Sequence, residues 1–143
     1  MYGSAEGFGI RPRTEGIIVH HTGFEPIGDA LLSWIAISKD HFNKGWQGIG
    51  YHYGIDPDGT IRQLGNINSW RAHIAQLNDR YIGVALLGDF TIQIPTSQQL
   101  DALEWLVSYL RGIYGDLPCY GHREVAIEAT ACPGATWKEW LPL

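Results

Sequence analysis

Short apolar runs rich in β-branched residues alternate along this chain with longer segments of helical periodicity, and this alternation constrains the fold most strongly. Residues 16–20 and 81–90 are strand candidates. Residues 50–65 predict a hairpin, because Asp58-Gly59 is a turn signal between two strand-like stretches. Strands that alternate with helices are typical of an α/β domain in which helices flank a central mixed sheet. The patterns do not indicate the order of the strands.

The helix with the clearest boundaries follows Pro95. Thr96 and Gln99 form a T-x-x-Q capping box, and Gly115 ends the pattern. Apolar side chains recur between these limits at a spacing of three and four residues. They are Leu100, Leu103, Leu106, Val107, Leu110, Ile113 and Tyr114.

A second helix is predicted over residues 30–45, with Asp29 as its N-cap and Gly45 at its end. The pattern favours one buried face on this helix. That face would consist of Leu31, Trp34, Ile35, Ser38 and Phe42.

The C-terminal part of the chain predicts a strand over residues 117–122, an irregular segment, and a short helix over residues 137–141. The whole chain has 143 residues and contains no repeat, low-complexity tract or linker. A chain of this length is typical of one domain that buries its own core. We therefore expect residues 1–143 to form a single domain.

The charge pattern and the apolar pattern exclude several classes of protein. The net charge is −5 and no run of basic residues occurs, which argues against a nucleic-acid partner. No apolar run approaches the roughly 18 residues that span a bilayer, so we expect no membrane insertion. The first 16 residues lack the pattern of a signal peptide, which predicts a protein made in the cytoplasm. The two cysteines, Cys119 and Cys132, are expected to be thiols.

Polar residues with metal-binding or catalytic chemistry follow the predicted strands. Ligands of open α/β sheets gather at such strand ends. The residues are His20, His21, Tyr51, His52, His122 and Cys132. Two or three His/Cys ligands without a fourth thiol suggest a zinc ion with an open coordination position. Ordinary strand-end histidines and a buried cysteine that packs as a small apolar residue would produce the same spacing.

Four motifs occur in the order found in a known family. They cover residues 17–23, 48–65, 71–90 and 121–134. The chain resembles the zinc-dependent N-acetylmuramoyl-L-alanine amidases, in the superfamily of the peptidoglycan-recognition proteins and the phage-lysozyme-type enzymes. The resemblance extends from about Gly16 to Trp140 and implies an α/β domain with a zinc site at the strand ends.

The resemblance implies a role for several residues. The ligands of one Zn²⁺ ion would be His20, His122 and Cys132, with water in the fourth position. Tyr51 and Thr130 would be catalytic, and His73 and His21 would bind substrate. For His73, contact with the metal ligands from behind or stabilisation of its own loop is an alternative to substrate contact.

The same resemblance implies a bacteriolytic hydrolase that acts on bacterial peptidoglycan in the cell wall. Zinc-activated water would cleave the amide between the lactyl group of N-acetylmuramic acid and L-alanine of the stem peptide. A phage or prophage endolysin that works as a monomer fits these features. One alternative is a non-catalytic peptidoglycan-binding module, but such relatives often lack a ligand, commonly the cysteine. Another is a regulatory protein that binds a polymerase.

Other aromatic and histidine residues have simpler expected roles. His52 should point away from Tyr51 and be structural, and His41 should lie at the surface or at the rim of the site. Trp46 and Trp70 would either line a substrate groove or pack in the core.

Overall fold

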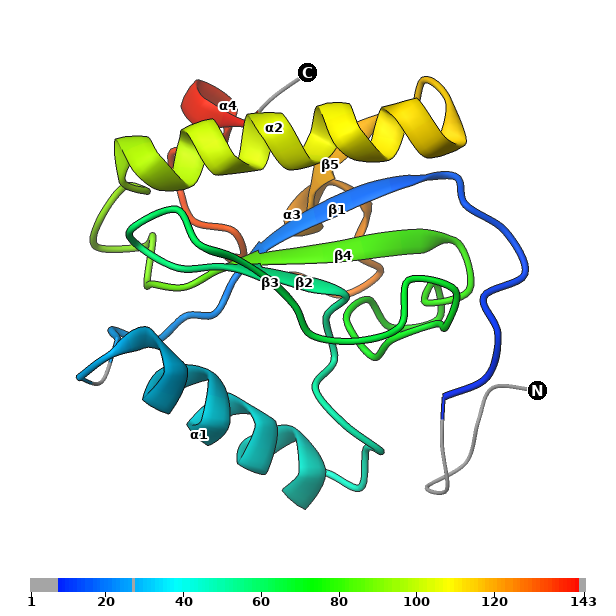
Figure 1. The fold of residues 1–143 in the computed structure, drawn as a ribbon, viewed down its shortest axis with the longest axis horizontal. Helices are drawn as coiled ribbons and strands as arrows, with labels where there is room; N and C mark the ends of the chain where they lie inside the picture. Colours follow the sequence, from blue (N-terminus) through cyan, green and yellow to red (C-terminus); the bar gives the residue numbers. More distant parts are fainter. Residues whose placement is uncertain (1–7, 27, 142–143) are drawn as a thin grey trace.

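The alternation of apolar runs and amphipathic segments produces an α/β fold, shown in Figure 1. The computed structural model describes residues 8–26 and 28–141. Residues 1–7 lie outside the described residues. They belong to the segment that we expect to lack a signal peptide. The elements are β1 (Gly16–His21), α1 (Ala30–Asn43), β2 (Tyr53–Ile55), β3 (Ile61–Gln63), β4 (Tyr81–Leu86), α2 (Ser97–Tyr114), β5 (Cys119–Gly121), α3 (His122–Val125) and α4 (Trp137–Trp140).

The strands form one mixed sheet in the order β3-β2-β4-β1-β5. β1 is parallel to both β4 and β5, and β2 is parallel to β4. β2 and β3 form the expected antiparallel hairpin. Because three of the four pairings are parallel, the carboxyl ends of β1, β4 and β5 lie along one edge of the sheet.

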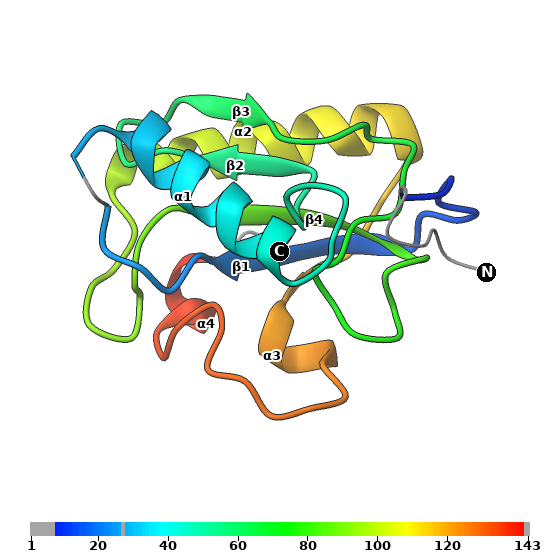
Figure 2. The same ribbon diagram turned by 90° about the horizontal axis from the view of Figure 1, so that it is seen from below.

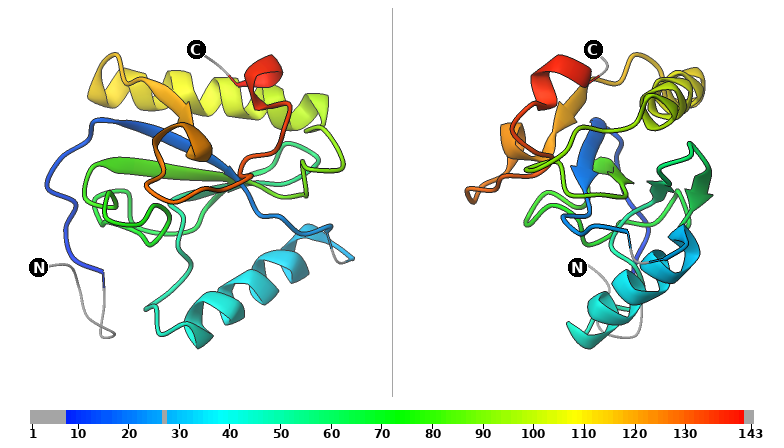
Figure 3. Two further views of the ribbon diagram at one scale, coloured as in Figure 1. Left: turned by 180° about the vertical axis from the view of Figure 1, so that it is seen from behind. Right: turned by 90° about the vertical axis from the view of Figure 1, so that its left-hand side faces the viewer.

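The helices cover both faces of the sheet. α2 and α4 lie on one face and α1 on the other, as Figures 1 and 2 show. The end view in Figure 3 shows the same three layers. Alternate residues of β4 point to the two faces, so Val84 packs toward α2 whereas Ala85 packs toward α1.

The capping pattern of α2 is confirmed. The N-cap hydroxyl of Thr96 accepts a hydrogen bond from the backbone N–H of Gln99 (3.0 Å), and the Gln99 side chain accepts one from the backbone N–H of Thr96 (3.1 Å). Gln99 also donates from Nε2 to the carbonyl oxygens of Ile55 and Leu87, which ties the helix start to the sheet. Gly115 forms the C-cap, as expected.

Of the face predicted for α1, only Trp34 is buried, and Ser38 is half-buried. The cap itself is confirmed, because the Asp29 carboxylate accepts from the backbone N–H of Leu32 (3.0 Å). The side chains that are buried are Ser33, Trp34, Ile37 and His41. The side chains that remain exposed include Leu31, Leu32, Ile35 and Phe42. Both stripes have helical spacing, and only the stripe around Trp34 reaches Ile49, Ala85 and Leu87.

The segment after β5 begins with a short helix, α3, where the sequence predicted only irregular structure. The Glu124 carboxylate accepts a hydrogen bond from the backbone N–H of Gly121 (2.8 Å) and supports the start of this helix. Within the described part of the chain, no helix has the length and hydrophobicity needed to cross a bilayer.

Candidate metal centre and adjoining cavity

The strand register brings His20 and His122 together. Val19 of β1 pairs with Gly121, the last residue of β5, so His20 in β1 and His122 at the start of α3 lie at the same level. The ring centroids of His20 and His122 are 4.6 Å apart. Parallel pairing therefore converts two distant histidines into neighbours at the carboxyl edge of the sheet.

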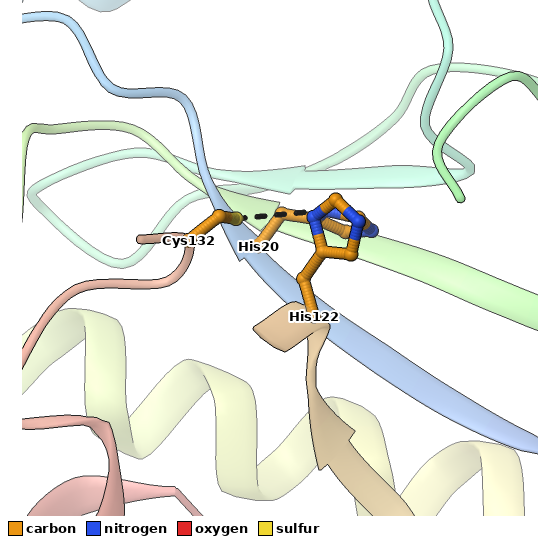
Figure 4. Close-up of side chains that lie close together, drawn as sticks. All are labelled: His20, His122 and Cys132. Carbon is orange, nitrogen blue, oxygen red and sulfur yellow. Dashed lines mark hydrogen bonds between the residues drawn. The ribbon is translucent and has the colours of Figure 1, made fainter. Parts of the chain in front are cut away.

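Cys132 completes a cluster with these two histidines. Its carbonyl oxygen accepts a hydrogen bond from the backbone N–H of Arg123 (3.0 Å), and its Sγ accepts one from the backbone N–H of His21 (3.3 Å). Sγ lies 3.7 Å from Nδ1 of His20. Figure 4 shows the three side chains converging from β1, the start of α3 and the loop before α4. One potential ligand atom from each residue lies within 4.8 Å of the other two.

The protonation states of the cluster suit a cation that prefers nitrogen and sulfur ligands. Burial, together with the neighbouring histidines, holds the pKa of His20 well below its usual value, and burial also lowers the pKa of His122. Both rings are therefore neutral near pH 7 and offer lone pairs. Burial raises the pKa of the Cys132 thiol to about 12, against the opposing effect of the His21 backbone N–H. A divalent ion that replaces the thiol proton would satisfy this donor set, and two imidazoles with one thiolate fit Zn²⁺.

The cluster opens into a cavity of about 270 Å³. Tyr51 and Thr130 both line this cavity, beside His20, His122 and Cys132. The Tyr51 ring is 5.2 Å from the His20 ring, and burial and the nearby Cys132 raise the pKa of its phenol. The Thr130 hydroxyl oxygen accepts from the backbone N–H of Cys132 (3.2 Å), so its own proton is available to another acceptor.

His21 lines the same cavity but turns away from the cluster. Its Nδ1 accepts a hydrogen bond from the backbone N–H of Phe90 (3.0 Å), and Asp89 lies 4.0 Å from the same atom. Burial lowers the pKa of His21 although Asp89 opposes the shift. The neutral ring then carries its proton on Nε2, which makes His21 a hydrogen-bond donor.

His73 lies against His20 and is only 7% exposed. Its Nδ1 is 2.9 Å from Nε2 of His20, and its Nε2 is 3.0 Å from the carbonyl oxygen of Tyr81. Burial lowers the pKa of His73 to about 3, although the bond to Tyr81 opposes the shift. His73 thus lines the same cavity, but both of its nitrogens have partners within the protein.

Two further residues, His41 and Lys44, line the cavity. His41 is 7% exposed, so of its two expected placements the one at the rim of the site is confirmed and the one at the surface is wrong. Its Nδ1 accepts from the backbone N–H of Gly50 (2.9 Å). Lys44 also lines the cavity, with Nζ 5.2 Å from the centroid of the Trp46 ring. A lysine at a helix end is an ordinary solvated residue in sequence, so no local signal identified it.

The remaining aromatic and polar candidates either line the cavity or are buried elsewhere in the protein. Trp46 lines the cavity, whereas Trp70 is buried and packs edge-to-face against Phe8. His52 is fully buried and bonded to backbone groups of Ser69 and Gly83, which confirms its structural role. Both cysteines are free thiols, as expected.

Similarity to known proteins indicates the family of this chain independently of the geometry of the cluster. The family model for N-acetylmuramoyl-L-alanine amidase matches residues 11–135. Peptidoglycan-recognition protein LB of Drosophila melanogaster is 33% identical over 128 residues, which cover 82% of this chain and 53% of that protein. The chain thus spans about half the length of this relative. The endolysin of Enterobacteria phage K11 is 30% identical over 110 residues, which cover 73% of this chain and 72% of the endolysin.

A solved structure with the same fold is N-acetylmuramoyl-L-alanine amidase LysC from Clostridium intestinale URNW. It matches with a TM-score of 0.82 and 31% sequence identity. The match covers 94% of this chain and 86% of LysC.

Proposed function

This chain belongs to the N-acetylmuramoyl-L-alanine amidase family, and we propose that it is an active, zinc-dependent member that hydrolyses bacterial peptidoglycan. The scissile bond is the amide between the lactyl group of N-acetylmuramic acid and L-alanine of the stem peptide. The observation that carries this proposal is the cluster of His20, His122 and Cys132 at the opening of a cavity.

His20, His122 and Cys132 would hold the zinc ion. The chemistry that zinc supplies in such a site is Lewis acidity, which polarises a carbonyl and lowers the pKa of water to about 7. Two neutral imidazoles and one thiolate leave the site with a net positive charge, which favours the developing oxyanion of the substrate. Three protein ligands, rather than four, leave a position open for chemistry.

Tyr51 and Thr130 would act as hydrogen-bond donors to the reacting amide. The raised pKa of Tyr51 keeps its phenol protonated near pH 7, so it donates rather than acts as a base. Thr130 accepts from the Cys132 backbone and keeps its hydroxyl proton for the substrate oxygen. His21 presents Nε2–H on the same cavity and would bind the substrate beside these donors.

The complete ligand set supports catalysis over recognition alone. A module that only binds peptidoglycan has no need for three convergent nitrogen and sulfur ligands, of which two are neutral imidazoles. The similarity to a phage endolysin supports a bacteriolytic role of the same kind on the cell wall. A monomer is part of this proposal.

The test is the chemistry of the released products. The purified protein with zinc should release new L-alanine amino termini from insoluble peptidoglycan without new reducing sugar ends. Chelation should abolish this release, and added zinc should restore it. Binding to peptidoglycan without release would instead identify a recognition module, and new reducing ends would identify a glycosidase.

The two cysteines provide a matched pair of variants. Cys132→Ala should lose both zinc and amidase activity, while Cys119→Ala, which changes a buried thiol in the core, should retain both. Full activity of zinc-free Cys132→Ala would contradict the proposed mechanism.

A further inference from the structure

We propose that His73 is a positioning residue that holds His20 in the tautomer whose Nδ1 lone pair faces the ligand cluster. This inference rests on the proposed metal binding at His20. It assigns to His73 an action through His20 in place of the direct substrate contact that the sequence resemblance implied.

The direction of the hydrogen bonds follows from the carbonyl of Tyr81. A carbonyl oxygen only accepts, so Nε2 of His73, 3.0 Å from it, must carry a proton. In a neutral ring Nδ1 is then the acceptor, and the atom 2.9 Å away, Nε2 of His20, must be the donor. Nδ1 of His20 consequently has a free lone pair, and this is the atom 3.7 Å from Cys132 Sγ.

The surroundings of His73 favour the neutral ring that this chain of bonds requires. The ring is buried, and burial disfavours an imidazolium. Arg11 and Arg71, the arginines that act on it electrostatically, are both cations and disfavour a further positive charge.

The fold provides a specific space for the His73 ring. A Cβ atom added at Gly83 would lie 2.7 Å from Cγ and Nδ1 of His73, so the ring occupies room that only a glycine in β4 leaves. The Asn78 side-chain oxygen accepts from the backbone N–H groups of His73 (3.0 Å) and Ile74 (2.8 Å). The position of the ring is thus determined from both the sheet and the loop that carries it.

Hydrogen-bond partners of metal-binding histidines fix the tautomer and orientation of the ligand, and their loss typically lowers metal affinity about 10–100-fold. His73→Leu should therefore weaken zinc binding within this range, measured by chelator competition. His73→Asn places an amide oxygen near the position of Nδ1 and should recover most of the affinity.

His52→Leu is the control for loss of a neighbouring buried histidine, because His52 bonds to backbone groups of Ser69 and Gly83 and touches the His73 ring only by edge-to-face packing, with centroids 5.7 Å apart. It should lower the free energy of unfolding and leave the zinc affinity unchanged. Equal zinc affinities for His73→Leu and the unaltered protein would overturn the inference. A raised KM in that same His73→Leu variant would then identify His73 as a substrate contact.

The tautomer can be read in the unaltered, metal-free protein, so the test survives if a variant does not fold. Long-range ¹H–¹⁵N correlation spectra should show His20 protonated at Nε2 only. A proton at Nδ1 of His20, or a mixture of the two forms, would overturn the inference. This measurement is independent of zinc, so a protein that binds no zinc would refute the proposed function without deciding the tautomer.

Discussion

The imidazole rings of His20 and His122 lie 4.6 Å apart because β1 and β5 are parallel neighbours in the sheet. Val19 pairs with Gly121 in the register of these strands, and His20 and His122 are the residues that follow them. The pairing of these strands thus brings together two candidate ligands, His20 and His122, that are far apart in the sequence.

His20 and His21 are predicted to differ in their effect on metal binding. His20→Ala removes a ring that faces Cys132 and should lower zinc affinity by more than the roughly 10–100-fold caused by loss of a ligand's hydrogen-bond partner. His21→Ala should retain zinc, because the His21 ring bonds to Phe90 instead. Zinc content after dialysis and chelator competition measure both effects. Equal loss of zinc in the two variants would contradict the assignment.

Tyr51 and Tyr53 belong to one sequence segment, but their replacement by Phe should have different effects on kcat. Tyr51→Phe removes a phenol that lines the cavity and should lower kcat by about 10²–10³-fold, as loss of one oxyanion donor does, with zinc content unchanged. Tyr53→Phe is the control, because Tyr53 packs against the core cluster beneath α2. Release of amino termini from peptidoglycan measures the rates. Unchanged kcat in Tyr51→Phe would rule out a catalytic role.

Acid should destabilise the protein through His41. Burial lowers the pKa of His41 to about 4, with Lys44 acting in the same direction and Asp40 opposing. Between pH 6.5 and about 4 the unfolded chain therefore binds a proton that the folded protein does not. The stabilisation is complete above pH 6.5, and it decreases as the pH falls, by at most about 1.4 kcal/mol per unit.

The pH effect can be isolated with His41→Asn, whose side-chain oxygen can still accept from the backbone N–H of Gly50. Denaturant unfolding of both chelated proteins at several pH values gives the comparison. The free energy of unfolding should decrease less steeply in the variant below pH 6.5. Parallel curves would show that His41 does not titrate in this way.

The N-cap of α2 should contribute measurably to stability. Thr96→Ala removes the acceptor for the Gln99 N–H and the donor to the Pro57 carbonyl (2.5 Å). The free energy of unfolding should fall by about 1–2 kcal/mol. Ser97→Ala is the control, because Ser97 is exposed and its hydroxyl donates to the neighbouring Gln98 side chain (3.2 Å). A cap effect no larger than this control would contradict the prediction.

Local patterns were sufficient where one segment satisfies its own hydrogen bonds. The capping box of Thr96 and Gln99, the Asp29 cap and the turn at Asp58-Gly59 all formed as predicted. Such signals are read correctly because the donor and the acceptor lie within a few residues of each other.

The sequence by itself determined which segments become strands and helices, apart from α3, and, through the family resemblance, which residues could bind zinc. Only the tertiary structure decided the strand order, the buried stripe of α1 around Trp34 and Ile37, and the contact between His20 and His73. The physical reason is that two stripes of α1 have helical spacing, of which the buried one includes Ser33 and His41, and the choice between them depends on the surface that Ile49 and Leu87 present. The partner of His20 likewise depends on the space at Gly83, which exists only after β1 and β4 have paired.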